Sequence, residues 1–494
     1  MFDGSLPEVG DLAALGDTAL VDAVGGWARA ENAACARKLS AMAELFCRRT
    51  GLDDAKERDG WWVDPDAAVA AESAAAVGIS QGLALSQTHR GVALRDRLPT
   101  VAALFEAGLI SDLLVRTIVW RTALILAPFT MKMVDRALAA RVTRWGALSA
   151  KKTEQAIDAL VEQVDPGALR RSREGSTGRD VAFGSPSDEP GFTRMWARLY
   201  ASDAVVVERR VEEIARSVCD ADPRSLAERR ADALTALAAG HTALACECGE
   251  SDCPAGQRDS TPPVTAIVQV IADEATVRAA TATAKHAEPQ QCTAPPAFVI
   301  GGGVMPAPLL AATLKHATVR EVRHPGEAPP EPRYTPSRKL ADFIRCRDLT
   351  CRFPGCDRPA THCDIDHTVP YPVGPTHPSN LKCLCRFHHL LKTFWNGIGG
   401  WRDRQLPDGT VIWTSPTGHT YTTYPGSRHL FPKLCKPTAT LWSRDPPALD
   451  TTPDRGVMMP RRRHTRAHTT ARAIAAERRL NDDLVAERNR PPPF

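Results

Sequence analysis

Six of the 14 cysteines lie between Cys346 and Cys385, and this cluster restricts the fold more than any other feature of the sequence. A second group lies upstream and contains Cys246, Cys248 and Cys253. The chain starts with an acidic segment and has no apolar run of the roughly 18 residues that span a bilayer. We therefore expect a cytoplasmic protein that enters no membrane. Disulfides are rare in the cytoplasm, so clustered cysteines there predict metal sites.

Two paired spacings within the larger cluster predict a structural zinc site. Cys351 and Cys356 flank the turn Arg-Phe-Pro-Gly, and two residues separate Cys385 from His388. Two such pairs supply the four ligands of a tetrahedral Zn²⁺ site. Because a small module has little core of its own, the ion would supply much of its folding free energy. Free buried thiols are the alternative, and other nearby cysteines could replace one of these ligands: Cys346, Cys363 and Cys383.

The same stretch contains polar residues that the zinc site does not need: Asp366, His367, Asn380 and His389. Asp366 and His367 end an expected short strand, Asn380 lies in a loop, and His389 begins an expected helix. The adjacent residues His388 and His389 point about 100° apart on a helix. One imidazole can therefore face the zinc ion while the other faces a second site.

This second set of residues suits the hydrolysis of a phosphodiester. His367 can act as the general base, because an imidazole titrates near neutral pH. Asp366 and His389 can hold one divalent ion, which would stabilise the charge of the transition state. Asn380 can fix the His367 loop or ring by hydrogen bonds. Three basic residues could contact flanking phosphates or be solvated surface: Lys382, Arg386 and Lys392.

The stretch resembles the HNH endonuclease family, which has the ββα-metal fold. The matching pieces are C-R-F-P-G-C, D-I-D-H, G-P-T followed by N-L, and L-C-R-F-H-H-L-L-K. The resemblance implies that Asp366 and His389 bind the catalytic metal and that His367 is the general base. It also implies that Asn380 is the central asparagine of the signature, and that His388 binds zinc where many members have a cysteine.

Two positions depart from the pattern of this family. Val373 stands where members often have the first glycine of Gly-Gly-Pro-Thr, and Thr393 stands where some enzymes have a further histidine. The catalytic metal would then have one protein ligand fewer than in those enzymes.

Apolar residues at three- and four-residue steps predict helices across residues 16–240. The Ala-rich helices, Arg-Leu-Pro at 97–99 and the motif C-E-C-G-E-S-D-C-P resemble actinobacterial repeat-family proteins. Those proteins pair a domain of unknown function 222 with an HNH module. They are often associated with mobile elements, and the resemblance implies the same association here.

Changes in composition predict a mainly α fold, with a large N-terminal helical domain and a small C-terminal ββα-metal module clamped by zinc. The expected segments are a helical domain (1–245), a Cys-containing turn with a short α/β segment (246–324), a Pro-rich linker (325–336), the HNH module with trailing short strands (337–425) and a basic tail that is disordered or a fraying helix (426–494).

The upstream cysteine group predicts a second zinc site. Cys246, Cys248 and Cys253 could bind an ion together with His241. Ordinary free thiols on a polar turn are the alternative.

The net charge of +4 over 494 residues does not by itself indicate a nucleic-acid partner. The leading hypothesis is nevertheless a DNA endonuclease with a structural Zn²⁺ and a catalytic Mg²⁺ or another divalent ion. The alternative is a non-catalytic DNA-binding or assembly protein whose HNH-derived module is folded by zinc. The sequence leaves the oligomeric state open.

Overall fold

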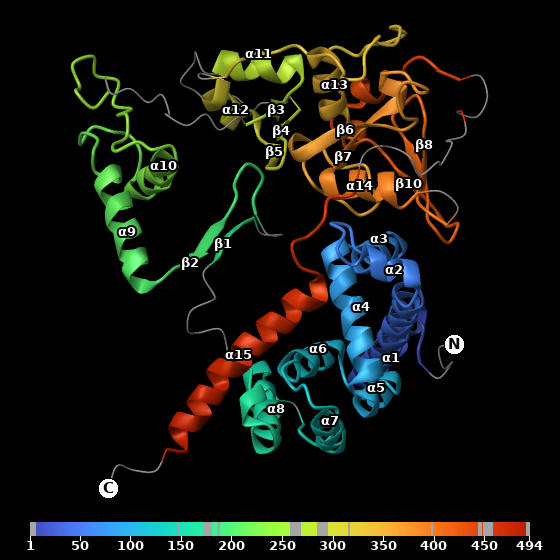
Figure 1. Ribbon diagram of the computed structural model, residues 1–494. Coiled ribbons are helices and arrows are strands. Elements are labelled where there is room, and N and C mark those ends of the chain that lie inside the picture. The colour runs from blue at the N-terminus through green and yellow to red at the C-terminus, as the bar shows by residue number, and fades with distance from the viewer. Residues whose placement is uncertain are drawn as a thin grey trace. The chain divides into compact units, whose positions relative to one another are not determined.

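Among the residues that the structure describes, helices make up most of the regular structure, and the strands form small sheets of two or three (Figure 1). This confirms the mainly helical fold class, with a small Cys/His module near the C-terminus. The computed structural model describes residues 6–146, 148–170, 180–184, 188–256, 268–283, 295–314, 317–396, 399–442, 447 and 458–490.

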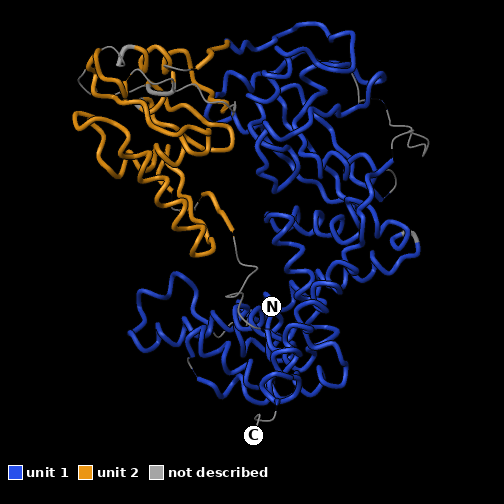
Figure 2. Tube along the Cα trace, turned by 60° about the vertical axis from the view of Figure 1, so that its left-hand side comes forward, with its two compact units in different colours: residues 1–171, 321–494 blue, residues 172–320 orange. Residues whose placement is uncertain are grey.

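The chain divides into two compact units (Figure 2). Unit 1 contains residues 1–171 and 321–494, and unit 2 contains residues 172–320. Unit 1 is therefore built from both ends of the chain. The domain boundaries expected at 245, 324, 336 and 425 remain predictions.

The N-terminal part of unit 1 is a set of helices, most of which contribute side chains to one apolar core. They are α1 (Asp17–Thr50), α2 (Asp53–Arg58), α3 (Pro65–Val77), α4 (Gln81–Asp96), α5 (Pro99–Glu106), α6 (Asp112–Arg121), α7 (Pro128–Val142) and α8 (Ala150–Val164). The core is lined mainly by branched and aromatic side chains, among them Leu39, Phe105, Ile118, Leu138 and Val161.

Short polar side chains determine where several of these helices begin. Ser80, Ser111 and Ser149 each accept a hydrogen bond from the backbone N–H three residues later. Such N-caps satisfy amide groups that have no partner within the helix. Pro65 and Pro99 occupy the first turn of their helices, where the missing N–H costs nothing.

The helix α15 (Arg466–Arg488) packs against the short 3-10 helix η2 (Pro166–Ala168) of the same unit. Asn481 is buried and donates to the carbonyl oxygens of Gly167 and Leu169, and Arg478 pairs with Asp165 at 2.9 Å. Of the two alternatives expected for the tail, the structure has a helix over Arg466–Arg488. Its partners lie some 310 residues away in the chain, so local composition does not reveal them.

The C-terminal module (residues 337–425) combines two small antiparallel sheets with two helices. It contains α13 (Arg338–Asp348), β6 (Cys363–His367), β7 (Leu381–Cys385), α14 (Arg386–Phe394), β8 (Arg402–Gln405), β9 (Val411–Thr414) and β10 (Thr420–Thr423). β6 pairs with β7, and the other three strands form a sheet in the order β10-β9-β8. Phe353, Trp401 and Trp413 form an aromatic core between these elements.

The segment 325–336, expected to be a linker, lies against the C-terminal module. The backbone N–H of Glu331 donates to the carbonyl oxygen of Thr376 at 2.9 Å. The carboxylate of Glu331 accepts from the backbone N–H and the hydroxyl of Ser337 at the start of α13. This segment therefore packs against the C-terminal module and does not only connect it to the preceding chain.

Unit 2 is built from short elements with little core. They are β1 (Asp180–Phe183), β2 (Met195–Arg198), α9 (Ala201–Ala215), α10 (Leu226–Ala238), β3 (Val270–Ile271), α11 (Glu274–Thr283), β4 (Ala297–Val299), β5 (Gly303–Met305) and α12 (Ala307–Leu314). β1 and β2 form a hairpin, and β4 lies between β3 and β5. Two separate small apolar clusters stabilise this unit.

Within the described part of the chain, no single helix has the length and apolar character to cross a membrane. The pair α3 and α4, bent by 106°, meets that test only when taken together, by length and composition alone.

Candidate functional site

The hairpin β6–β7 and the helix α14 form the frame of the candidate site. The strands pair in a register that sets Asp366 opposite Lys382 and Cys363 opposite Cys385. Cys385 ends β7 and is also the N-cap residue of α14, so the chain turns directly from strand to helix. The order of two strands followed by a helix is the one expected for this stretch.

The four predicted zinc ligands come together in this frame: Cys351, Cys356, Cys385 and His388. Their ligand atoms all lie within 4.8 Å of one another. Nδ1 of His388 lies 3.3 Å from Sγ of Cys385 and 3.6 Å from Sγ of Cys351. Three thiols and an imidazole nitrogen at this spacing fit a tetrahedral zinc ion, so the cluster could hold one.

The three alternative cysteines lie outside this group. Burial raises the pKa of Cys346 to about 12 and that of Cys383 well above its usual range. Both are therefore neutral thiols at neutral pH. The Cys363 thiol donates instead to the Pro359 carbonyl oxygen at 3.3 Å.

The residues expected to form the catalytic site lie beside this cluster. Asp366 and His367 are buried, whereas His389 is partly exposed. Nε2 of His389 faces Oδ1 of Asp366 at 3.5 Å, and Nδ1 of His389 lies 2.8 Å from Oδ2 of Asp364. Asp364 was not expected at the site. Its carboxylate accepts the Nδ1–H of the ring, which directs Nε2 toward Asp366.

One hydrogen bond assigns the tautomer of His367. Nε2 of this residue lies 2.9 Å from the hydroxyl oxygen of Thr376. That hydroxyl has one hydrogen, which it donates to the carbonyl oxygen of Arg333 at 2.5 Å, so it accepts from His367. Nε2 therefore carries the ring proton, and Nδ1 keeps its lone pair.

The surroundings keep the His367 ring neutral. Burial, reinforced by the charges of Lys382 and Lys392, lowers the pKa of His367 to about 4. The carboxylate of Asp366 opposes this shift without cancelling it. The ring of Tyr334, from the segment expected to be a linker, stacks on His367 with centroids 5.3 Å apart. At neutral pH the imidazole is thus in the form that can accept a proton.

Asn380 holds the loop that follows His367. Its side-chain oxygen accepts from the backbone N–H of Val369 at 2.8 Å, and its amide nitrogen donates to the carbonyl oxygens of Val369 and Pro375. A Cβ on Gly374 would lie 2.1 Å from the Val369 carbonyl oxygen, so only glycine fits there. The departure at Val373 is harmless to this contact, because that side chain is exposed.

Lys382 and Lys392 do not lie where phosphate contacts were expected. Lys382 is completely buried, and its Nζ lies 2.8 Å from Asp366 and 2.6 Å from Asp403 of β8. Nζ of Lys392 lies 2.6 Å from the same oxygen of Asp366, Oδ2. The two lysines balance the two carboxylates. Of the three predicted basic residues, Arg386 alone has an exposed side chain, paired with Asp364 at 3.3 Å.

This charge cluster fixes the ionisation of Asp366. Burial alone would raise the pKa of its carboxyl group, but Lys382 and Lys392 hold that pKa well below its usual range. Because both lysines bind Oδ2, Oδ1 remains directed at His389. The strand register explains the position of Lys382, since residues paired across two strands extend to the same face.

A second buried ion cluster stabilises the hairpin β6–β7. Asp348, at the end of α13, pairs with Arg347 and Arg352 and accepts from the backbone N–H of Cys383 at 2.8 Å. Arg347 also donates to the carbonyl oxygens of Pro378 and Leu381. Sequence reasoning missed this ion cluster, although an Arg-Asp pair at the end of an amphipathic helix could have indicated it.

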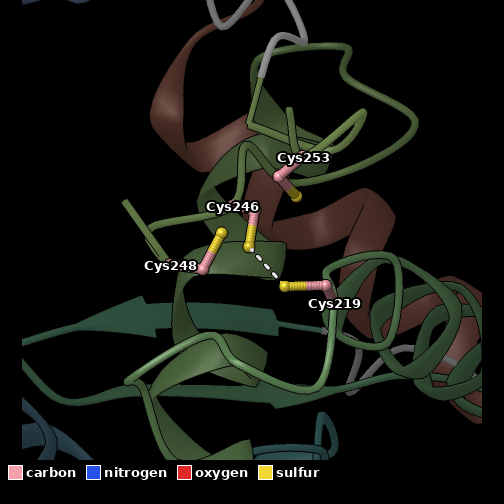
Figure 3. Close-up of side chains that lie close together, drawn as sticks. All are labelled: Cys219, Cys246, Cys248 and Cys253. Carbon is pink, nitrogen blue, oxygen red and sulfur yellow. Dashed lines mark hydrogen bonds between the residues drawn. The ribbon is translucent and has the colours of Figure 1, made fainter. Parts of the chain in front are cut away.

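The upstream cysteines also come together, but with a different fourth member. Sγ atoms of Cys219, Cys246, Cys248 and Cys253 lie within 4.8 Å of one another (Figure 3). His241, predicted as a ligand, is not part of the group. Its backbone N–H instead donates to the carbonyl oxygen of Ala236 near the end of α10. Cys219 follows α9, and the α9–α10 turn brings it to a loop 27 residues further on.

The model of the family described as "Domain of unknown function (DUF222)" matches residues 27–348. This match ends before the first predicted ligand of the C-terminal cluster. It covers α10, the cysteine loop of unit 2 and the helix α13.

Several proteins of Mycobacterium tuberculosis are similar to the chain. "Uncharacterized protein Rv2100" of strain ATCC 25618 / H37Rv is 50% identical over 520 residues, which cover 100% of this chain and 93% of that protein. "Uncharacterized protein Rv3776" of the same strain is 50% identical over 505 residues, with coverage of 100% and 95%. "Uncharacterized protein in est 3'region" is 45% identical over 354 residues, with coverage of 69% and 100%. No solved structure matches the chain.

Proposed function

The chain belongs to the family of the domain of unknown function DUF222, and we propose that its C-terminal module is a metal-dependent endonuclease that hydrolyses phosphodiester bonds in DNA. The observation that carries this proposal is the arrangement of three side chains on one hairpin and one helix. A neutral His367 lies next to a carboxylate, Asp366, whose free oxygen faces the imidazole of His389.

His367 is the general base in this proposal. Its Nε2–H is bound to Thr376, which leaves Nδ1 to take a proton from the attacking water. Because the ring is neutral at neutral pH, no prior deprotonation is needed. Asn380 keeps the loop after His367 in place through its three hydrogen bonds and is thus a positioning residue.

Oδ1 of Asp366 and Nε2 of His389 would hold the divalent ion, and this carboxylate–imidazole donor set accepts Mg²⁺ and several other ions. A bound ion there supplies stabilisation of the negative charge on the phosphate and the departing oxygen. Asp364 orients the His389 ring, and the lysines on Oδ2 keep Asp366 ionised.

DNA is the substrate that the resemblance to HNH endonucleases implies, together with an association with mobile elements. The exposed guanidinium of Arg386 lies at the start of α14, where it could contact a phosphate beside the cleaved bond. The nearby zinc cluster supports the same module by fixing the N-terminal turn of α14, on which His389 lies.

The test is a plasmid-nicking assay of the full-length protein with Mg²⁺ or Mn²⁺. Removal of a general base typically costs a factor of about 10² to 10⁴, so His367→Ala should lower the cleavage rate by that amount. His429→Ala is the matched control, because His429 is an exposed histidine outside the site, and it should cleave like the parent.

Two outcomes contradict the proposal: equal cleavage by parent and His367→Ala, or no cleavage by the parent with any divalent ion. In the second case, a band-shift assay that still detects DNA binding would support the non-catalytic DNA-binding alternative. The two lysines buried against Asp366 are the observation that favours this alternative, because they already neutralise the carboxylate.

A second variant tests the role of Asp364. Asp364→Asn weakens the hold on Nδ1 of His389, so the protein should need about 10- to 100-fold more Mg²⁺ for half-maximal cleavage. The maximal rate at saturating Mg²⁺ should recover. A loss of rate that added Mg²⁺ does not restore would contradict the positioning role.

A further inference from the structure

Four cysteines of unit 2 converge from two separate stretches of chain (Figure 3). Cys219 lies just after α9, and the other three lie on the loop that follows α10. Sγ of Cys219 and Sγ of Cys246 are 3.4 Å apart, far beyond the roughly 2.05 Å of a disulfide bond. The distance is close to the about 3.8 Å that separates two thiolates on one tetrahedral zinc ion with bonds of about 2.3 Å.

The loop has the backbone features of a turn that presents thiols to one point. The backbone N–H of Cys246 donates to the carbonyl oxygen of Ala255, and the backbone N–H of Gly256 donates to the carbonyl oxygen of Cys253. Gly249 follows Cys248 with a φ of 78°, a conformation that side chains other than glycine rarely adopt. The loop is therefore closed on itself at both ends of the C-E-C-G-E-S-D-C sequence.

A buried ion pair holds the two stretches together beside the thiols. Asp222, three residues after Cys219, accepts two hydrogen bonds from the guanidinium of Arg224 and a further one from the backbone N–H of Glu247. Arg224 also donates to the carbonyl oxygen of Ala245 at 2.8 Å. Cys219 and Cys246 are thus brought together by contacts that do not involve either thiol.

The apolar core at this place is very small. It consists of four buried residues of α9, α10 and the following turn: Ile214, Ala215, Ala233 and Leu244. Two of these are alanines, which bury little apolar surface. Helices of 15 and 13 residues need tertiary contacts to be stable, and this core offers few of them.

We propose that Cys219, Cys246, Cys248 and Cys253 bind one Zn²⁺ as four thiolates, and that this ion supplies much of the folding free energy of residues 201–256. Thiolate ligands select zinc among the common divalent ions by their softness, and a set of four cysteines closes a structural site with no open position. Binding displaces the four thiol protons into solvent and changes no oxidation state. The site is independent of the proposed nuclease site, which lies in unit 1.

The first test is the zinc content of the full-length protein, measured by mass spectrometry of the metal after purification without added zinc. The parent should contain about two zinc ions per chain, one for each cluster. Cys219→Ser should lower this by about one. His241→Ala is the matched control and should keep the parent content, because His241 is not part of the group.

The second test uses the unmodified chain and does not depend on the folding of a variant. Thiol alkylation followed by peptide mapping should find the four cysteines protected, and a zinc chelator should increase their labelling rates at least tenfold. Cys47 of α1 lies outside both clusters and should react at the same rate before and after chelation.

The proposal is overturned if chelation leaves the four labelling rates unchanged. It is also overturned if Cys219 and Cys246 are cross-linked in protein prepared without reductant, or if a folded Cys219→Ser variant retains the parent zinc content.

Discussion

The two cysteine clusters have almost the same ligands, yet their surroundings differ. In the C-terminal module, Cys351, Cys385 and His388 are buried, and the His388 ring stacks on Phe353 with centroids 3.9 Å apart. In unit 2, three of the four cysteines are only half-buried, and the adjacent core holds four residues.

The difference indicates two uses for a similar site. The C-terminal module has an aromatic core and a buried ion cluster around Asp348, so a metal bound there would mainly fix the start of the helix that carries His389. The α9–α10 segment has an apolar core of only four buried residues, and the arginines paired with Asp222 are partly exposed, so its metal would replace a core. The amount of packing around a cluster, more than the identity of its ligands, determines what the ion contributes.

Metal removal should have the largest effect on this comparison. A structural zinc ion contributes on the order of 10 kcal/mol, so chelation should lower amide protection in α9 and α10 more than about a thousandfold. In β6 and β7 the loss should be smaller, because the aromatic core remains. Hydrogen exchange with mass spectrometry of the full-length protein measures both. An equal loss of amide protection in the two regions would contradict the proposed difference between the two clusters.

Removal of the central carboxylate of each ion cluster should have the next largest effect. Asp348→Ala leaves Arg347 and Arg352 without a counter-charge, and their side chains are only 2% and 1% exposed. This substitution should lower the free energy of unfolding by about 3–5 kcal/mol. Asp222→Ala should cost only about 1–3 kcal/mol, because Arg224 and Arg229 are 15% and 20% exposed and can hydrate.

The measurement is the urea dependence of exchange protection in each segment, with the parent protein as reference. If Asp222→Ala lowers the free energy of unfolding as much as Asp348→Ala does, the exposure of the partner arginines does not determine the loss of stability.

Glycine substitutions in the two cysteine turns should have the smallest effects. Gly249 and Gly355 have φ values of 78° and 73°, so alanine at either costs about 1–2 kcal/mol for the backbone alone. At Gly249 a Cβ meets open space, whereas at Gly355 it would lie 2.8 Å from the carbonyl oxygen of Ile79. Gly355→Ala should therefore weaken zinc retention more than Gly249→Ala, as measured by competition with a chelator. The reverse order would contradict the packing difference.

Local spacing was sufficient to predict that Cys351, Cys356, Cys385 and His388 come together, and that the chain is mainly helical. Cys351 and Cys356 share a turn, and Cys385 and His388 share the start of a helix, so each pair is fixed within a few residues. Capping residues such as Ser111 also act locally. The sequence could not reveal Cys219 as the fourth member of the second cluster, because the helix α10 separates it from Cys246 in the chain.

The sequence by itself determined which residues could serve as ligands, base and turn formers, because these roles follow from side-chain chemistry and near-neighbour spacing. The tertiary structure alone decided how they are used. It buried Lys382 and Lys392 against Asp366, set Asp364 behind His389 and folded residues 325–336 over His367 through Tyr334. Each of these contacts joins strands, helices or segments whose distance in space is set by packing. Local composition therefore does not predict these contacts.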